Sequence, residues 1–519
     1  MGKTANARKR RRLAATTAAG DPLGKALFDK HHKQRSFAPP PPTTPDSPTS
    51  LSDADVDLDV ETDDTNAEAN DALSASSAPL GGISPRDLAT TVATLSALEQ
   101  LPAVLRGKEC KALRIALHRL NAASAAAGIG GGTTLSGRVS DALADGRWND
   151  ALVLLAEMRE RGMVPKLGAL QRWVRDCDAV SGPDGGLKGQ GEVLRVLDAI
   201  LRTADPEMVP RGDGDVEDVV RRHAAWAPCA PVTVEADAVV SATEEDAARY
   251  KAGFRVVAYE KGPERRTPNL HDFILYASAP GTIARAPATA PAVARHDVPN
   301  VPGCFMLTDV LTPQQCTSIL NAAETVGFTP DAPIVGAAAE QTSVLAHNLF
   351  WLADSDLLDA IFTRCAPHLP QTLSSTAGGG GSGSSLNLRG INARWRVYRY
   401  VPGAVYRPHI DGAWPASGLD PVTGEYVYDL HRDQRSRLTF LVYLNDGFEG
   451  GHTTFFTPGR VEGRMDAWPV SPRAGAVLCF PHGEAKGALL HEGSAVERGA
   501  KYIIRADVLY DLHKTSTRT

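Results

Sequence analysis

The C-terminal part of this 519-residue chain is a succession of short strand-like runs, and this pattern constrains the fold most strongly. From Asn392 onward, runs rich in aromatic and β-branched residues alternate with segments that contain Pro and Gly, as is typical of strands joined by turns. Many short strands separated by turns predict a jelly roll or a barrel. The predicted strands span residues 395–400, 404–409, 436–444, 453–456, 476–480, 489–492 and 502–510.

The segment before these strands carries helix signals. Residues 305–311 are expected to form a strand, after which Thr312 suits a helix N-cap and Pro313 suits the first helical position. Gly327 then ends this helix. We expect a second helix over residues 352–365.

Residues 84–205 show the periodicity of amphipathic helices. The stretch 142–165 resembles one pentatricopeptide-repeat unit, in which Gly146 and Gly162 end helices and Pro165 prevents continuation. Repeat arrays need about three or more units to bury a continuous core, and only one clear unit is present. Two interpretations therefore stay open: a small helical domain for packing or partner contact, or an RNA-binding repeat. The predicted helices span 87–98, 108–126, 135–145, 149–161, 167–176 and 192–203.

Residues 1–83 have the composition of a disordered tail. A proline run at 39–42 and an acidic stretch at 53–71 leave too little apolar surface to offset the entropy of ordering. The basic cluster 8–12 is either a nuclear-import signal or nucleic-acid patch, or simply a solvated tail. Neither a secretory signal nor an apolar run of about 18 residues is found. We expect a nuclear or cytoplasmic protein with no membrane span.

Residues 206–296 give a mixed pattern. It predicts strands at 231–234, 254–259 and 272–276 and a helix at 244–251, as a small module or a layer added to the C-terminal domain. The sequence therefore predicts a multidomain protein. Its parts are a tail (1–83), a helical domain (84–205), a small α+β segment with an Ala/Pro-rich linker at 279–294 (206–296), and a β domain (297–515, core 388–512) containing a flexible Gly/Ser loop at 378–385.

Charge and cysteine content exclude several classes. The net charge of −6 provides no global basic field for nucleic acid, so any such contact has to be local. The seven cysteines form no CxxC pair, which argues against a disulfide framework and a zinc ribbon and favours a reducing compartment.

The tripeptide His409-Ile410-Asp411 carries the clearest chemistry. On a strand, residues two apart share a face, so His409 and Asp411 point the same way and Ile410 points to the other side. Two histidines and one carboxylate around Fe(II) leave three coordination positions open, which suits a chelating 2-oxoacid and O2. The same pattern in His431-Arg432-Asp433 lies in a polar segment and is interpreted as a charged surface loop.

The third ligand has to come from another strand. His452, His482 and His491 are the candidates, and His491 ends an apolar run. Glu497-Arg498-Gly499 is a suitable hairpin turn, which would bring Lys501 back beside the strand of His491. Lys501 would then pair with an acidic cosubstrate in the same cavity.

Five ordered blocks together resemble the prolyl 4-hydroxylase type of Fe(II)/2-oxoglutarate-dependent dioxygenase, over residues 301–512. The blocks are Tyr400-x-x-Gly403-x-x-Tyr406-x-Pro408-His409-x-Asp411, Leu441-x-Tyr443-Leu444-Asn445, Gly450-Gly451-x-Thr453-x-Phe455, Pro472-x-x-Gly475-x-x-x-x-Phe480, and His491-x10-Lys501-Tyr502-x-x-Arg505-x-Asp507.

This resemblance implies a double-stranded β-helix in which His409, Asp411 and His491 bind the iron and Lys501 binds the distal carboxylate of 2-oxoglutarate. Tyr400 resembles a tyrosine that contacts this cosubstrate, although a packed aromatic is an equal reading. Arg505 is an alternative carboxylate partner. The insertion at 412–435 departs from the family pattern and is expected to form a substrate lid or specificity loop.

The implied reaction is hydroxylation of a C–H bond with decarboxylation of 2-oxoglutarate to succinate, and ascorbate keeps the iron reduced. The expected substrate is a protein side chain, such as proline. The same chemistry on nucleic acid or a small molecule is an alternative. A helical-repeat RNA- or protein-binding protein with a degenerate oxygenase domain is another, against which the complete set His409, Asp411, His491 and Lys501 speaks.

Overall fold

The computed structural model describes residues 84–100, 102–126, 134–182, 185–208, 218–231, 242–261, 272–330, 345–374, 385–484 and 486–511. The predicted tail with its basic cluster lies outside these residues, as do most of the strand predicted at 231–234 and all but the last residue of the predicted Gly/Ser loop. Among the described helices, none combines the length and the apolar character needed to cross a bilayer.

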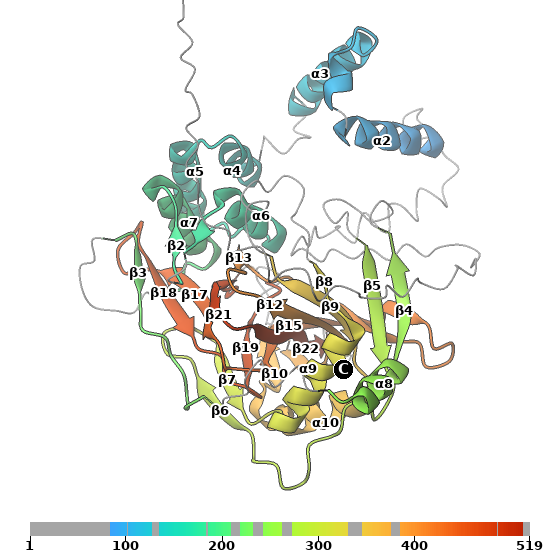
Figure 1. The fold of residues 1–519 in the computed structure, drawn as a ribbon. Coiled ribbons are helices and arrows are strands. Elements are labelled where there is room, and N and C mark those ends of the chain that lie inside the picture. Colours follow the sequence, from blue (N-terminus) through green and yellow to red (C-terminus); the bar gives the residue numbers. More distant parts are fainter. Residues whose placement is uncertain are drawn as a thin grey trace, which may run out of the picture. The chain divides into compact units, whose positions relative to one another are not determined.

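Two β-sheets face each other in the C-terminal part of the chain (Figure 1). Side chains from both sheets meet in one buried cluster that includes Leu441 of the larger sheet and Phe455 of the smaller. This mostly-sheet region agrees with the predicted jelly roll. The larger sheet has the order β4 (Phe254–Glu260), β5 (Phe273–Ser278), β9 (His347–Leu352), β12 (Arg394–Tyr400), β22 (Lys501–Asp511), β15 (Tyr426–Tyr443), β19 (Val477–Pro481), β7 (Phe305–Thr308) and β6 (Ala294–Asp297).

Shorter strands complete this architecture. β8 (Thr329–Pro330), β10 (Thr372–Ser374), β11 (Ser385–Ile391) and β14 (Pro415–Leu419) attach to the larger sheet off its main path. The smaller sheet has the order β13 (Tyr406–His409), β20 (Leu490–Gly493), β17 (Thr453–Pro458), β18 (Met465–Val470) and β3 (Val220–Arg222). Two further pairs are β1 (Val180–Ser181) with β2 (Leu187–Lys188), and β16 (Glu449–Gly450) with β21 (Val496–Arg498).

The outer face of the larger sheet is covered by α9 (Pro313–Val326) and α10 (Ser355–Cys365), which share one apolar core with it. The sequence predicted the start and end of α9 correctly, because Thr312 forms a capping box and Gly327 is the C-cap. The predicted start of α10 at Leu352 was wrong. Leu352 ends the buried strand β9, and the side chain of Asp354 caps the helix.

Four helices pack together beside the smaller sheet: α4 (Leu135–Ala144), α5 (Trp148–Glu160), α6 (Leu167–Cys177) and α7 (Gly191–Ala204). Of these, α6 contacts β13 and α7 contacts β17. Their apolar side chains form one buried cluster together with Ile410, Phe456 and Leu490 of the β region. Two further helices, α2 (Pro85–Gln100) and α3 (Lys111–Ala126), precede these four and flank the 3-10 helix η1 (Pro102–Arg106). All six helices predicted between residues 84 and 205 are therefore confirmed, each within three residues at both ends. The pentatricopeptide-repeat character of 142–165 stays a prediction.

Strands from residues 206–296 join the larger sheet. β4 and β5 form an antiparallel pair, as predicted, and β5 continues the sheet alongside β9. The helix predicted before them is α8 (Glu244–Gly253), and β6 pairs with β7 across the predicted boundary at residue 297. A last 3-10 turn, η5 (Ala366–His368), follows α10.

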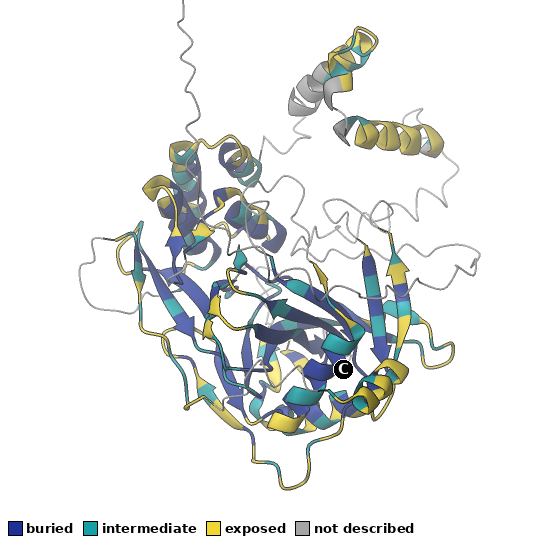
Figure 2. Ribbon diagram, viewed as in Figure 1, coloured by how far each residue is buried: buried dark blue, intermediate teal, exposed yellow. Residues whose placement is uncertain are grey.

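The insertion at 412–435 forms a β-hairpin rather than a loop. Its strand β14 pairs with the first half of β15, an 18-residue strand that continues into the centre of the larger sheet. The prediction that His431 and Asp433 lie in a surface loop was therefore wrong, because hydrogen bonding to β14 makes this polar segment a strand. Figure 2 shows burial over the whole C-terminal part of the chain: the central strands are dark blue (buried), and the outer elements carry most of the yellow (exposed) residues.

Candidate metal centre

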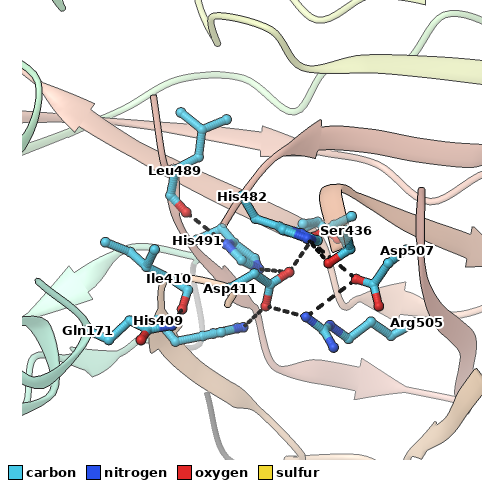
Figure 3. Close-up of polar contacts among 12 residues, drawn as sticks. Gln171, His409, Ile410, Asp411, Ser436, His482, Leu489, His491, Arg505 and Asp507 are labelled. Carbon is cyan, nitrogen blue, oxygen red and sulfur yellow. Dashed lines mark hydrogen bonds and ion pairs between the residues drawn. The ribbon is translucent and has the colours of Figure 1, made fainter. Parts of the chain in front are cut away.

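Three potential metal ligands converge at the end of the smaller sheet. β13 and β20 are paired so that His409 lies directly opposite His491, and Asp411 follows two residues after His409. One ligand atom from each of the three residues lies within 4.8 Å of the others. Figure 3 shows the two imidazoles and the carboxylate directed toward one another. The structure thus brings together the three residues selected from the sequence, and the other predicted candidates, His452 and His482, do not belong to this group.

Backbone contacts fix the orientation of both imidazoles. The Nδ1 of His409 lies 2.7 Å from the carbonyl oxygen of Arg407, and the Nδ1 of His491 lies 3.0 Å from that of Leu489. A carbonyl oxygen only accepts, so each Nδ1 carries a proton, which leaves Nε2 as the nitrogen that can bind a metal ion. Burial, together with the nearby His409, lowers the pKa of His491 to about 3, so this imidazole is neutral at physiological pH.

Asp411 supplies a buried carboxylate with only 2% of its surface exposed. Burial raises its pKa, but Arg505 and the two imidazoles outweigh that effect and hold the pKa well below its usual range. One carboxylate oxygen, Oδ2, accepts a 2.5 Å hydrogen bond from Thr439. The other, Oδ1, is buried and accepts no hydrogen bond from the part of the chain that the structure describes.

These donors fit a divalent metal. Asp411 Oδ1 lies 3.3 Å from the Nε2 of His409, and Asp411 Oδ2 lies 3.9 Å from the Nε2 of His491. The guanidinium of Arg505 lies 3.4 Å from Oδ1 and offsets part of its charge, but this oxygen accepts no hydrogen bond from the described residues and so keeps a lone pair for a metal ion. Two imidazole nitrogens and one carboxylate oxygen form a donor set suited to Fe(II) with open positions.

A chain of buried hydrogen bonds holds the carboxylate of Asp411 from behind (Figure 3). Thr439 donates its hydroxyl proton to Asp411, so its oxygen accepts from Nδ1 of His482 at 2.7 Å. The opposite nitrogen of His482 then accepts from the hydroxyl of Ser436 at 2.6 Å, and this oxygen accepts from the backbone N–H of Trp414. Burial lowers the pKa of His482 to about 3, so its ring is neutral and each nitrogen has a fixed role. His482 thus helps to orient the carboxylate of Asp411 through the hydroxyl of Thr439.

The helices also contact the metal-site strand. The side-chain amide of Gln171 in α6 donates to the backbone carbonyl of Ile410 at 3.1 Å, and both residues are buried. Asp178, at the end of α6, pairs with Arg407. The residue between the two predicted ligands is therefore held by the helical region, a relation that no local sequence pattern indicated.

The triad opens into a cavity of about 440 Å³, including the part open to solvent, between the two sheets. Lys501 and Tyr400 line this cavity together with the triad. Lys501 is 1% exposed, donates to the carbonyl of Gly451 at 2.7 Å, and has its Nζ 5.1 Å from the centre of the Tyr400 ring. Burial lowers the pKa of Lys501 to about 7.

The predicted route of Lys501 into this cavity was wrong. Strand β20, which carries His491, pairs with β13 and β17, whereas β22, which carries Lys501, lies in the other sheet between β12 and β15. Val496–Arg498 forms β21, which pairs with β16 and not with the strand of His491. Lys501 therefore reaches the cavity from across the sandwich.

Arg505 lines the same cavity at a different point. Its Nη2 lies 3.4 Å from Asp411 Oδ1 and 3.7 Å from Asp507 Oδ1. The sequence singled out Arg505 as a carboxylate partner but did not indicate its contact with Asp411. The sequence analysis also missed Thr439. Residues two apart on a strand share a face, so its position two residues before Leu441 could have indicated that its side chain points to the inside of the sandwich.

Comparison with known proteins agrees with this chemistry. Residues 395–506 match the family model described as the 2OG-Fe(II) oxygenase superfamily, so the chain contains such an oxygenase domain in its C-terminal part. No curated protein matches the chain.

Several solved structures are similar to part of the chain. A viral collagen prolyl hydroxylase from Paramecium Bursaria Chlorella virus-1 in its 2OG complex is 15% identical, with a TM-score of 0.23 over 40% of this chain and 97% of that chain. A Pseudomonas putida prolyl-4-hydroxylase is 18% identical, with a TM-score of 0.24 over 40% and 91%. A Trichoplax adhaerens prolyl hydroxylase in complex with a hypoxia inducible factor peptide fragment is 16% identical, with a TM-score of 0.26 over 40% and 84%.

Proposed function

We propose that this protein is an Fe(II)- and 2-oxoglutarate-dependent dioxygenase that hydroxylates a C–H bond, with decarboxylation of 2-oxoglutarate to succinate. One observation carries the proposal. The buried Oδ1 of Asp411, which accepts no hydrogen bond from the described residues, shares a small space with two imidazoles whose Nδ1 protons already point to backbone carbonyls. This arrangement suits a divalent cation, and the family match over 395–506 favours iron.

In this proposal, His409 and His491 would hold the iron through Nε2 and Asp411 would hold it through Oδ1. When bound, the iron supplies the activation of O2 and of the chelating 2-oxoacid. The chain supplies orientation. The carbonyls behind both imidazoles fix their rings, and Thr439 fixes the carboxylate. Ascorbate is the proposed reductant that keeps the iron in the ferrous state.

Lys501 is the proposed partner for the distal carboxylate of 2-oxoglutarate, and Arg505 is not. Arg505 lies 3.4 Å from Asp411 Oδ1, so a carboxylate bound to this arginine would lie beside the proposed metal position. The distal carboxylate of a chelating 2-oxoglutarate is three carbons away from the chelating carbonyl. Lys501 lies four residues from Arg505 on the same face of β22, about 13 Å along the strand. We propose that Tyr400, whose ring lies beside Nζ of Lys501, lines this cosubstrate site.

The proposed substrate is a protein side chain of the prolyl type, which rests on the resemblance of the five sequence blocks to prolyl 4-hydroxylases. The basic cluster at 8–12 supports a nuclear or cytoplasmic site of action.

The decisive experiment compares two single variants of the full-length protein. Under anaerobic conditions, Fe(II) and 2-oxoglutarate are expected to give a visible metal-to-ligand charge-transfer band, and O2 is then expected to yield succinate. His409→Ala should abolish both signals. His431→Ala, at the exposed histidine of the second His-x-Asp sequence on β15, is the matched control and should retain both. Wild-type protein that is folded but gives neither the band nor succinate would contradict the proposal.

A further inference from the structure

A glycine faces the metal cavity at a position where the backbone does not require one. Gly493 ends β20, two residues after His491, so both residues lie on the same face of the strand and line the cavity around the triad. The φ angle of Gly493 lies outside the left-handed region that favours glycine. Glycine weakens a strand, and within one it often marks a place that another group approaches closely. The absence of a side chain at Gly493 is therefore explained by the space around it rather than by the backbone.

The smaller sheet has a gap at this glycine. Strand register places Tyr406 of β13 on one side of Gly493 and Thr453 of β17 on the other. All three residues line the cavity, but only the outer two carry side chains. The next inward position along β20 is His491, about 7 Å away. The gap is therefore adjacent to the triad.

An added methyl group would enter this gap and meet the tyrosines around it. A Cβ built on Gly493 would lie 3.2 Å from the Cβ of Tyr406 and 3.6 Å from the hydroxyl oxygen of Tyr400. Two carbon atoms attract each other best at about 3.5–4.0 Å, so the first of these contacts is tight. The Cβ of Tyr406 is bonded to the backbone of β13 and moves only with that strand. Even one methyl group would thus fill part of the gap.

The gap lies between the triad and Lys501. This lysine reaches over from the larger sheet and donates to the carbonyl of Gly451, two residues before Thr453. Its Nζ lies 5.1 Å from the centre of the Tyr400 ring, and the hydroxyl of Tyr400 borders the gap. In the proposed function, 2-oxoglutarate is held by the metal at one end and by Lys501 at the other. Its two methylene groups then have to cross this part of the cavity.

We propose that Gly493 provides the space for the methylene groups of 2-oxoglutarate and is therefore a specificity-determining residue of the cosubstrate site. This inference rests on the proposed oxygenase function and adds to it a selection by shape. Lys501 selects the distal charge, whereas the gap at Gly493 accepts the carbon chain that joins this charge to the chelating end.

The test compares two chelating ligands on full-length protein loaded anaerobically with Fe(II). The affinity for 2-oxoglutarate comes from titration of the charge-transfer band. Oxalate chelates a metal ion but has no carbon chain, and its affinity comes from displacement of the band. Gly493→Ala is expected to weaken 2-oxoglutarate about tenfold, because the added methyl group overfills the gap. The affinity for oxalate should stay unchanged, since oxalate does not extend as far as Gly493.

A second variant and a matched control sharpen this test. Gly493→Val adds a larger side chain and should weaken 2-oxoglutarate further; where it prevents folding, the alanine variant decides. The control is Gly390→Ala in β11, because a methyl group added there would meet nothing within 4 Å. This control should keep both affinities. Thermal unfolding of the iron-free variants separates a filled ligand gap from disturbed packing around Tyr406.

Two results would overturn the inference. One is an unchanged affinity for 2-oxoglutarate in Gly493→Ala, with or without a loss of thermal stability, because the glycine would then serve only the packing of Tyr406. The other is an equal loss of 2-oxoglutarate and oxalate, which would place the effect at the metal itself. Absence of the band in the wild type is a different result and counts against the proposed oxygenase function.

Discussion

Two His-x-Asp sequences occur in this chain, and they differ in every respect except the pattern. His409 and Asp411 lie at the end of the smaller sheet, with Asp411 2% exposed and aligned by Thr439. His431 and Asp433 lie on β15 where it pairs with the hairpin strand β14, and His431 is exposed. A metal site therefore depends on what surrounds the pattern: a third ligand opposite, a donor behind the carboxylate, and burial.

Of the changes that test this comparison, removing the buried carboxylate of Asp411 is expected to have the largest effect on iron affinity. Asp411→Asn replaces an anionic ligand with a neutral amide of the same shape, so iron affinity should fall by more than the roughly 10–100-fold typical of outer contacts. Asp433→Asn should leave iron affinity unchanged. Metal titration of both full-length variants measures this. Equal losses in the two variants would mean that the surface pair contributes to binding.

The second-largest effect is expected from replacing Lys501, which enters the cavity from the larger sheet. Lys501→Met should weaken 2-oxoglutarate binding roughly 10–100-fold, because a charge-assisted bond to the distal carboxylate is lost. Lys486→Met, at a surface lysine paired with Glu207, should leave 2-oxoglutarate affinity unchanged. Titration of the charge-transfer band with 2-oxoglutarate gives both affinities. If Lys501→Met binds 2-oxoglutarate with unchanged affinity, Arg505 becomes the candidate partner of the distal carboxylate.

Binding of 2-oxoglutarate should also depend on pH through Lys501. Burial lowers the pKa of this lysine to about 7, so its charged form is lost as the pH rises through that value in the free protein. The anionic cosubstrate needs the charged form, and its apparent affinity should therefore fall as the pH rises above 7. Lys501→Arg keeps its charge at all these pH values and should flatten the profile. Parallel pH profiles for the wild type and this variant would refute the assignment.

A smaller effect is expected from the support behind the carboxylate. Thr439→Val removes the hydroxyl that donates to Asp411 and should weaken iron roughly 10-fold. The matched control is Thr454→Val, since Thr454 is equally buried but contacts Ser494 rather than a ligand. Metal titration with a parallel unfolding measurement separates the loss of alignment from general destabilisation. An iron affinity equal in both variants would remove Thr439 from the site.

The smallest predicted effect lies in the helical region. Gln171→Leu keeps the volume but leaves the buried carbonyl of Ile410 without its donor, which should cost about 1–3 kcal/mol in the free energy of unfolding. Iron affinity should fall only a few-fold, because the ligands themselves remain. Gln371→Leu, at a glutamine that donates to Ala366 far from the ligands, is the control. Chemical denaturation and metal titration of the two variants measure these effects.

Local sequence patterns predicted the structure correctly where interactions between residues close in sequence determine it. The caps of α9 and the apolar periodicity of six helices predicted those elements within a few residues. Alternation along a strand also placed His409 and Asp411 on one side and Ile410 on the other. The short strand β14 and the polar half of β15 escaped prediction, because pairing with each other, rather than an apolar pattern, makes them strands.

The sequence by itself determined the ligand types, their spacing and the order of the blocks that resemble the oxygenase family, because these depend on side-chain chemistry at fixed separations along the chain. Tertiary structure alone decided which histidine stands opposite His409, that Lys501 arrives from the other sheet, and that Gln171 holds the carbonyl of Ile410 from 239 residues away. Contacts of that separation depend on strand pairing and on burial from both sides of a sheet. A linear pattern does not encode either of these.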